Sequence, residues 1–336
     1  MTSDETFRKR AIYLLLAVTV LGCALTFLWI GRVIFLLLFA SVIGAVFLDA
    51  IGHSLAKHLR IPRGLALALF LLAGLICAAL AFWIQGPNVL QQFAQLQTDL
   101  PVAAHRILGQ LQDHSWGRWL LSQAPDSDQI STGFRYALTR IGGIVLSSVT
   151  LLAGLAIVLS LSIYLASEPE IYFRGLRCLF PQEGRKTLDA CAASARKTLL
   201  WWVLAKLLSM TIVGVLIGIG LWLIGVPLAG PLAIIAALMT FIPNVGPLIS
   251  VLPAGLLGLA ISPTTGLLTL LVFAVVFVLE GYLVTPLLER NIVRLPPALT
   301  LLVQLLLAAV AGPIGVALAA PIAAVGIAIA SVLIEN

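Results

Sequence analysis

The sequence contains few charged residues. Of its 336 residues, 10% are Asp, Glu, Lys or Arg and 61% are apolar, whereas soluble domains have about 25% charged and roughly 45–50% apolar residues. A soluble fold of this length could not bury so much apolar surface. The composition therefore favours an integral membrane protein.

Residues suited to metal and redox chemistry are also scarce. The four cysteines include no Cys-x-x-Cys pair, and the four histidines do not have the spacing of metal ligands. There is no Ser-His-Asp pattern, no HExxH and no Walker loop. We therefore expect no catalytic residues, no cofactor, no bound metal and no enzymatic activity.

What the sequence does contain is a series of long apolar runs. A hydrocarbon core of about 30 Å requires roughly 20 helical residues. Six runs reach that length: 11–30, 33–52, 65–84, 141–166, 199–225 and 266–285. Because only Gly31-Arg32 separates the first two runs, we expect a tight helical hairpin there. The predicted fold class is an all-α polytopic membrane protein with about six full spans.

Two further apolar regions, 228–261 and 298–334, are interrupted. Gly246-Pro247 lies within the first and Gly312-Pro313 within the second. Proline removes a helical hydrogen bond and glycine lets the chain reverse, so we expect a helix break at each motif, 242–247 in the first region and Gly312-Pro313 in the second. Apolar runs of 10–14 residues are more often re-entrant than spanning. We therefore expect two broken re-entrant hairpins; the alternative is two pairs of kinked full spans.

The two interrupted regions are similar in their placement. Each follows a predicted span, these two spans run in opposite directions, and the Gly-Pro pairs are sixty-six residues apart. This arrangement is typical of an inverted-topology repeat, in which sites form where broken helices meet near the middle of the membrane. The alternative is a chance similarity between two glycine-rich apolar hairpins.

The basic residues predict the orientation of the chain. With the N-terminus inside, segments 1–10, 53–64, 167–198 and 286–297 face the cytoplasm and contain fourteen of the twenty Lys and Arg residues. Both termini are therefore expected in the cytoplasm. The same bias explains the net charge of +6 without nucleic acid as a partner.

The chain divides into four predicted regions. They are a three-span bundle at 1–84, an external segment of amphipathic helices at 85–140, a fourth span with a cytoplasmic helical segment at 141–198, and a core at 199–336 that contains both hairpins. The external segment packs on the membrane surface or the rest of the protein, or it forms a contact between subunits.

Seven residues are candidates for a transport path: Pro243, Asn244, Gly246, Pro247, Glu280, Gly312 and Pro313. The side chain of Asn244 could bind a cation or polar solute together with freed carbonyls, or it could cap the next half-helix. Glu280 lies in an apolar span, where a carboxylate either carries a proton inside the bundle or reaches the inner headgroups.

Two further charged residues lie in or beside apolar runs. Lys206 is about 10 Å inside its span. Its side chain either snorkels to the interface or forms an ion pair with Glu280. Asp49 is expected to be a polar residue at the inner edge of the second span.

Several motifs together resemble one known family. The stretch 241–250, Phe-Ile-Pro-Asn-Val-Gly-Pro-Leu-Ile-Ser, resembles the signature hairpin of the autoinducer-2 exporter (AI-2E) family of bacterial permeases. The resemblance continues in the same order over nearly the whole chain, through Glu280, Thr285-Pro286, Leu295-Pro296-Pro297 and Gly312-Pro313-Ile-Gly315. The chain departs from the family pattern at Leu295-Pro296-Pro297, where a His-Pro is common.

The resemblance implies a multi-pass protein of the bacterial inner membrane that forms a homo-oligomer in contact with lipid. It implies export of a small polar solute, such as an autoinducer-2-like signal, with or without proton coupling. One alternative is a monovalent cation/proton antiporter that moves H⁺ or Na⁺. A second alternative is a non-transporting oligomeric membrane scaffold that uses 85–140 as its contact surface.

Overall fold

The described part of the chain is entirely helical. The computed structural model describes residues 3–113, 148–288 and 296–335, with only the backbone described over residues 3–30, and all of its elements in these ranges are helices. Five helices are long and apolar enough to cross a membrane: Gly31–Leu59, Arg63–Ile84, Arg185–Ile224, Pro263–Leu288 and Pro297–Ile334. The pair Ala153–Ser167 and Pro169–Cys178, bent by 82°, would be a sixth. The all-α polytopic class is confirmed, and the number of spans stays a prediction.

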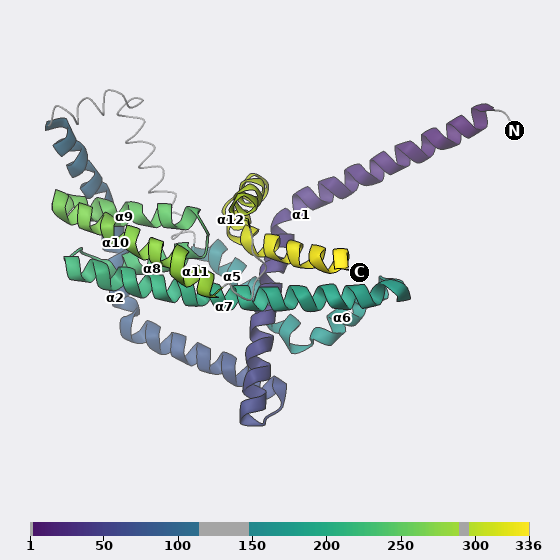
Figure 1. The fold of residues 1–336 in the computed structure, drawn as a ribbon, viewed down its shortest axis with the longest axis horizontal. Helices are drawn as coiled ribbons and strands as arrows, with labels where there is room; N and C mark the ends of the chain where they lie inside the picture. Colours follow the sequence, from purple (N-terminus) through teal and green to yellow (C-terminus); the bar gives the residue numbers. More distant parts are fainter. Residues whose placement is uncertain (1–2, 114–147, 289–295, 336) are drawn as a thin grey trace.

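The tight hairpin expected at Gly31-Arg32 is wrong. Helix α1 (Ser3–Leu59) continues through both residues, and its N-terminal half extends away from the other helices (Figure 1). The physical reason is that a glycine inside a helix costs only about 1 kcal/mol relative to alanine, and no proline follows to stop the helix. The cytoplasmic position of the N-terminus, which was predicted from the distribution of Lys and Arg, stays a prediction.

Helix α2 (Arg63–Asp113) joins the third predicted span to the predicted external segment. It passes through Pro87 and Pro101 without ending. Its second half packs against the core through Leu96 and Leu100, and the Arg106 guanidinium donates a hydrogen bond to the Ala260 carbonyl (3.3 Å). This part of the external segment therefore packs on the rest of the protein, and a subunit contact stays a prediction.

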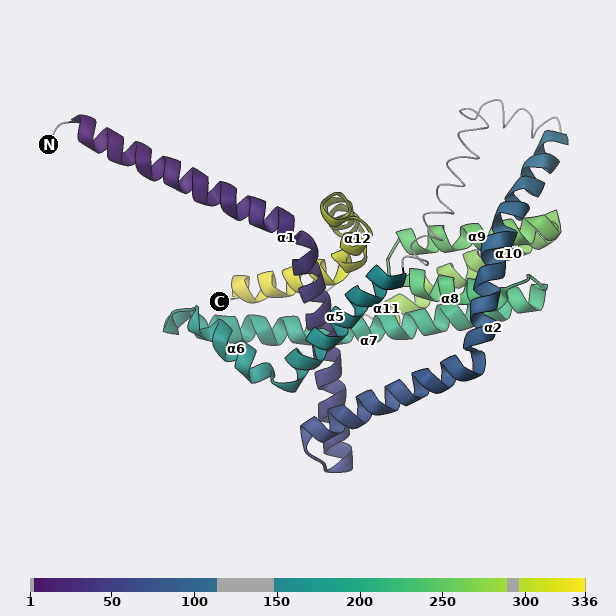
Figure 2. The same cartoon turned by 180° about the vertical axis from the view of Figure 1, so that it is seen from behind.

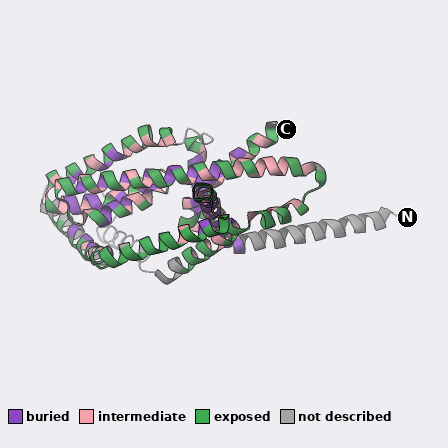
Figure 3. Ribbon diagram, turned by 90° about the horizontal axis from the view of Figure 1, so that it is seen from below, coloured by how far each residue is buried: buried purple, intermediate pink, exposed green. Residues whose placement is uncertain are grey.

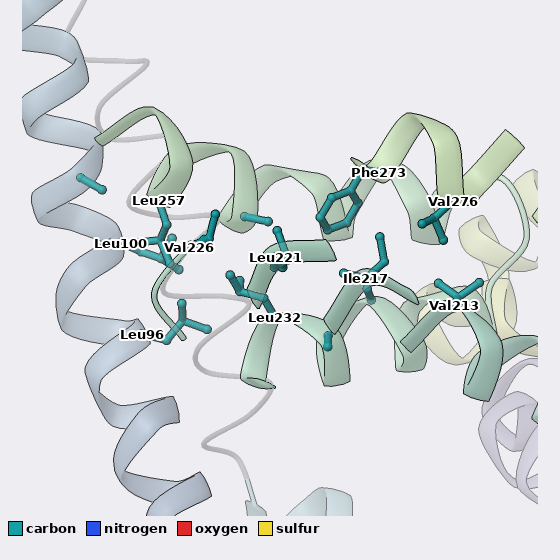
Figure 4. Close-up of a cluster of buried hydrophobic side chains, with 14 residues drawn as sticks. Leu96, Leu100, Val213, Ile217, Leu221, Val226, Leu232, Leu257, Phe273 and Val276 are labelled. Carbon is teal, nitrogen blue, oxygen red and sulfur yellow. The ribbon is translucent and has the colours of Figure 1, made fainter. Parts of the chain in front are cut away.

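Four consecutive helices form the centre of the molecule: α7 (Arg185–Ile224), α8 (Ala229–Thr240), α9 (Val245–Ile261) and α10 (Pro263–Leu279). They lie side by side in both views (Figures 1 and 2). Their largest apolar cluster includes Val213, Ile217, Leu232, Leu257 and Phe273 (Figure 4). Buried residues lie along the inner faces of these helices and exposed residues along the outer faces (Figure 3), as expected where lipid replaces water outside.

The first interrupted region is a helical hairpin made of α8 and α9. With 12 residues, α8 is about 18 Å long and is too short to cross the hydrocarbon core alone. The second region is α12 (Pro297–Glu335), which bends at Gly312 and whose two limbs point in different directions (Figure 1). Both predicted breaks are therefore present, and the inverted repeat stays a prediction.

The remaining described elements are short or peripheral. Helix α5 (Ser148–Ser167) packs on α1, where the Ser162 hydroxyl donates to the Ser41 carbonyl (3.0 Å). Helix α6 (Pro169–Cys178) and the 3₁₀ turn η1 (Gln182–Gly184) lead into α7. A π-helix, η2 (Glu280–Val284), and α11 (Thr285–Leu288) follow α10.

Candidate functional site

The tip of the first hairpin is a tight and strained turn. Asn244 has φ 65° and ψ −46°, and the Val245 N–H donates to the Pro243 carbonyl at 2.8 Å. A three-residue turn with a positive central φ is the rare form of the γ-turn. Asparagine tolerates positive φ better than most residues, which explains its presence here. Such strain gathers at functional sites, where surrounding contacts maintain it.

The Asn244 side chain does not cap the next half-helix. Although Asn244 precedes α9, its side chain makes no capping hydrogen bond, and the residue is exposed. The capping interpretation is therefore wrong for the side chain. Binding of a cation or solute by Asn244 stays a prediction.

Gly246 follows this turn and is required by a close approach of the backbone. Its N–H donates to the Ile242 carbonyl (3.0 Å). A Cβ atom at this position would overlap the carbonyl oxygen of Met239. Because that oxygen is part of the backbone, it cannot move aside as a flexible side chain would. Any residue larger than glycine should therefore deform the tip.

Two neighbouring helices hold the tip in place. The Lys206 ammonium of α7 donates to the Thr240 carbonyl (3.3 Å), and the Gln304 amide of α12 donates to the Pro243 carbonyl (2.9 Å). The Trp202 and Phe241 rings meet edge to face with centroids 5.5 Å apart. These contacts bring the first hairpin against both α7 and the first limb of α12.

The position of Lys206 settles one of the alternatives for this residue. The side chain is buried, with 7% of the residue exposed, and it points to the hairpin tip. Snorkelling to the interface is therefore wrong. The ion pair with Glu280 stays a prediction. Ser209, whose hydroxyl donates to Glu280, lies three residues after Lys206 on the same face of α7.

Glu280 begins the π-helix and is directed toward α7. Its Oε1 atom accepts hydrogen bonds from the Ser209 hydroxyl (2.8 Å) and the Thr285 hydroxyl (2.9 Å). Ser209 is itself buried. Single-turn π-helices are frequent at functional sites. The arrangement places a carboxylate between α7 and η2, and the choice between a proton carrier and a residue that reaches the inner headgroups stays a prediction.

The second break uses its glycines in another way. Gly312 has φ 62° and ψ −142°, a conformation that is essentially limited to glycine, and Pro313 follows it at an exposed position. A Cβ on Gly312 would meet no atom within 4 Å. The position that is closed to a side chain is Gly315, where a Cβ would overlap the Leu307 carbonyl oxygen.

Sequence reasoning missed two residues near the candidate site. Gln304 is 3% exposed and contacts the first hairpin from α12. Its signal in the sequence is a single amide in the apolar run 298–311. The sequence analysis named Gly315 only as part of a motif, and the fold shows that the Leu307 backbone carbonyl lies against it.

Asp49 has a larger role than that of an edge residue. It is 8% exposed and forms ion pairs with Arg63 at the start of α2 and Arg196 in α7. A carboxylate buried with two cations is stabilised by them, so that three helices meet at one charge cluster. The ion pairs are apart from the hairpin tip, and the edge interpretation was incomplete because both partners are distant in sequence.

In the described part of the chain, the side chains around the tip do not form a metal cluster. Among the residues that the structure describes, no group of three His, Cys, Asp or Glu side chains could hold a metal ion. The polar groups at the tip are backbone carbonyls, the Asn244 and Gln304 amides and the Lys206 ammonium. The Glu280 carboxylate meets α7 through the Ser209 hydroxyl. Such groups suit solute passage rather than bond chemistry.

Known proteins with similar sequences are transport proteins by name. Residues 15–335 match the family described as "AI-2E family transporter". "Putative transport protein YueF" of Bacillus subtilis is 27% identical over 311 residues, which are 88% of this chain and 83% of that protein. "Putative transport protein YrrI" of the same organism is 28% identical over 162 residues, 48% of this chain and 46% of that protein.

Proposed function

This chain belongs to the AI-2E family of transporters, and we propose that it is a permease that exports a small polar solute across the bacterial inner membrane. The observation that carries the proposal is the strained tip of the first hairpin. Irregular backbone at membrane depth is tolerated where protein or a water-filled cavity surrounds it. Here α7 and α12 contribute polar side chains to two of its carbonyls.

The proposed orientation has both termini in the cytoplasm. Arg63 belongs to the predicted inner segment 53–64 and Arg196 to the inner segment 167–198, and both meet Asp49. This contact supports the assignment of the two segments to the same side of the membrane. The proposed assembly is a homo-oligomer embedded in lipid.

The test of transport uses the purified chain in sealed vesicles. Vesicles are loaded with neutral hydroxylated solutes, with zwitterions or with Na⁺ and Rb⁺, and efflux is compared with that from protein-free vesicles. We expect efflux of at least one neutral polar solute. If no solute and no cation moves, transport is the wrong function and the scaffold alternative is favoured.

Cation/proton antiport is the second candidate, and Glu280 is the observation that favours it. Its carboxylate and the Ser209 and Thr285 hydroxyls gather oxygen atoms that suit H⁺ or Na⁺. Under antiport, Glu280→Gln should abolish the dependence of efflux on a pH gradient while the protein still assembles. The matched control is Glu170→Gln, which removes an exposed carboxylate paired with Arg174 in α6. Unchanged rate and pH dependence in Glu280→Gln would remove Glu280 as the proton carrier.

A further inference from the structure

The most unusual polar atom near the hairpin tip is the side-chain oxygen of Gln304. This Oε1 atom is fully buried and has no hydrogen-bond partner among the residues that the structure describes. Buried polar atoms are nearly always paired, and an unpaired one is costly. Within the described ranges, the second atom with this property is Asp49 Oδ1, which lies beside the Arg63 guanidinium and so has a charge partner.

The orientation of the Gln304 amide is fixed by its other end. Its Nε2 atom donates to the Pro243 carbonyl at 2.9 Å. Exchange of the amide oxygen and nitrogen would place two oxygens against each other, so the hydrogen bond determines which atom is the free one. The free atom is therefore an acceptor, and it lies at the strained turn of the first hairpin.

The side of α12 on which Gln304 lies faces the protein. Thr300 and Gln304 are buried one turn apart, whereas Leu301, Leu302, Leu305 and Leu306 are exposed. Further along the same limb, Ala311 packs on the cluster formed by Leu36, Leu199 and Leu318. The Gln304 amide is thus an inward-facing polar group, and the leucines on the other side of this limb are exposed.

The Pro243 carbonyl next to Gln304 has no lone pair left for a ligand. Pro243 O already accepts from Val245 N–H and from Gln304 Nε2. Thr240 O accepts from Lys206. Gln304 Oε1 is a buried side-chain acceptor beside this turn that has no hydrogen-bond partner among the described residues, and it is neutral and carries no proton to donate. A neutral acceptor in low-dielectric surroundings favours a neutral donor, and a hydroxyl group is the common donor of small polar metabolites.

We propose that Gln304 Oε1 binds a hydroxyl group of a neutral, hydroxylated solute as it passes the first hairpin. The inference rests on the proposed function and specifies its solute class. Gln304 then has two separable roles. Its Nε2 atom positions the Pro243 carbonyl, and its Oε1 atom contacts the solute.

Three substitutions separate the two roles. Gln304→Glu keeps an acceptor oxygen at the same reach, Gln304→Lys keeps a donor for Pro243 without an acceptor, and Gln304→Met has neither. The purified full-length protein is placed in sealed vesicles, and efflux of tritiated ribose is measured. Glycine betaine, which is polar but has no O–H or N–H donor, is the control solute. Folding of each variant is checked by gel filtration and thermal unfolding.

We expect the KM for ribose to rise about tenfold in Gln304→Met and Gln304→Lys and to change by less than about threefold in Gln304→Glu. The KM for betaine, where betaine moves, should stay constant in all three. The reverse order, with Gln304→Lys close to the unsubstituted protein and Gln304→Glu impaired, would mean that the amide only holds Pro243 and would overturn the proposal.

Other outcomes separate this inference from the proposed function. Efflux of betaine or cations without ribose overturns the hydroxyl assignment and leaves transport intact. Unchanged ribose efflux in Gln304→Met also overturns the assignment. Absence of all efflux from vesicles with correctly folded protein overturns both proposals together.

Discussion

The two breaks in the apolar helices share a Gly-Pro pair but differ in how the glycine is used. At the first break, Gly246 lies against the Met239 carbonyl, and the positive φ belongs to Asn244. At the second break, Gly312 has the positive φ, and Gly315 lies against the Leu307 carbonyl. In each break, one residue turns the chain and a later glycine lets backbone approach backbone.

This difference changes which residues of the two breaks correspond. The Gly-Pro motif in the sequence pairs Gly246 with Gly312. The close contact with a backbone carbonyl instead pairs Gly246 with Gly315. By the same logic, Asn244 pairs with Gly312 as the residue of positive φ. Substitutions at these positions can test whether residues of the two breaks correspond by their structural role or by the Gly-Pro sequence motif.

The largest effect is expected at Gly246. In Gly246→Ala, the added methyl group overlaps the Met239 carbonyl, which forces the hairpin tip to shift. Overpacking of this kind costs about 1–3 kcal/mol or more. Efflux from vesicles should fall to less than about a tenth, a loss larger than stability alone explains, because the tip forms the proposed path.

The matched control for this variant is Gly255→Ala in the same helix α9. A Cβ there would make ordinary contact with Leu270 at 3.5 Å. Near-normal efflux in Gly246→Ala would show that the first tip is not part of the path.

A comparable effect is expected at Gly315. The methyl group of Gly315→Ala overlaps the Leu307 carbonyl, whereas Gly326→Ala, in the same helix, adds a methyl group in open space. The first variant should lose most of its efflux and unfold at lower temperature. The second should be as stable as the original or more so, because alanine favours helix over glycine by about 1 kcal/mol. Equal efflux and equal stability of the two variants would contradict the pairing of Gly315 with Gly246 by structural role.

A smaller effect is expected at Gly312. The methyl group of Gly312→Ala meets no atom, so the penalty is the backbone strain of a positive φ, about 1–3 kcal/mol. Thermal unfolding in detergent should show a decrease, and efflux should be reduced less than in Gly315→Ala. A larger loss of efflux in Gly312→Ala than in Gly315→Ala would instead support the pairing of Gly312 with Gly246 by the Gly-Pro sequence motif.

The smallest effect on stability is expected at Asn244. Asn244→Gly removes the strain of a side chain at φ 65° and should keep the protein as stable or stabilise it by up to about 1 kcal/mol. Efflux measured in parallel separates the two remaining roles of this residue. Retained efflux means that Asn244 serves the turn, and lost efflux in a stable protein means that its amide binds the solute.

The features that could be predicted from the sequence are those that depend on nearby residues. Apolar runs of sufficient length predicted the all-α membrane class, and the motifs at 242–247 and Gly312-Pro313 predicted both helix breaks, because proline, glycine and asparagine act on their own backbone. The expected hairpin at Gly31-Arg32 failed because two residues without proline are too weak a helix stop.

The contacts that hold the site could not be read from spacing. Gln304 and Pro243 are 61 residues apart, and Arg196 and Asp49 are 147 apart. No periodicity relates such positions, since their meeting depends on how α1, α7, α8 and α12 pack. Likewise, the sequence marks Gly315 only as another glycine, and the carbonyl that excludes a side chain there comes from the preceding limb.

The π-helix after α10 sets the angular register of the residues that follow it. The Thr285 N–H bonds to the Glu280 carbonyl five residues back, so this turn contains one residue more than an α-helical turn. If the hydrogen bonds shifted to the α-helical pattern, every later residue would rotate by about 100° around the helix axis. The Thr285 hydroxyl would then leave Glu280, and Leu288 would leave the Trp202 cluster beside Phe241. A single shift of backbone hydrogen bonding would thus move both Thr285, which bonds Glu280, and Leu288, which packs beside the hairpin tip.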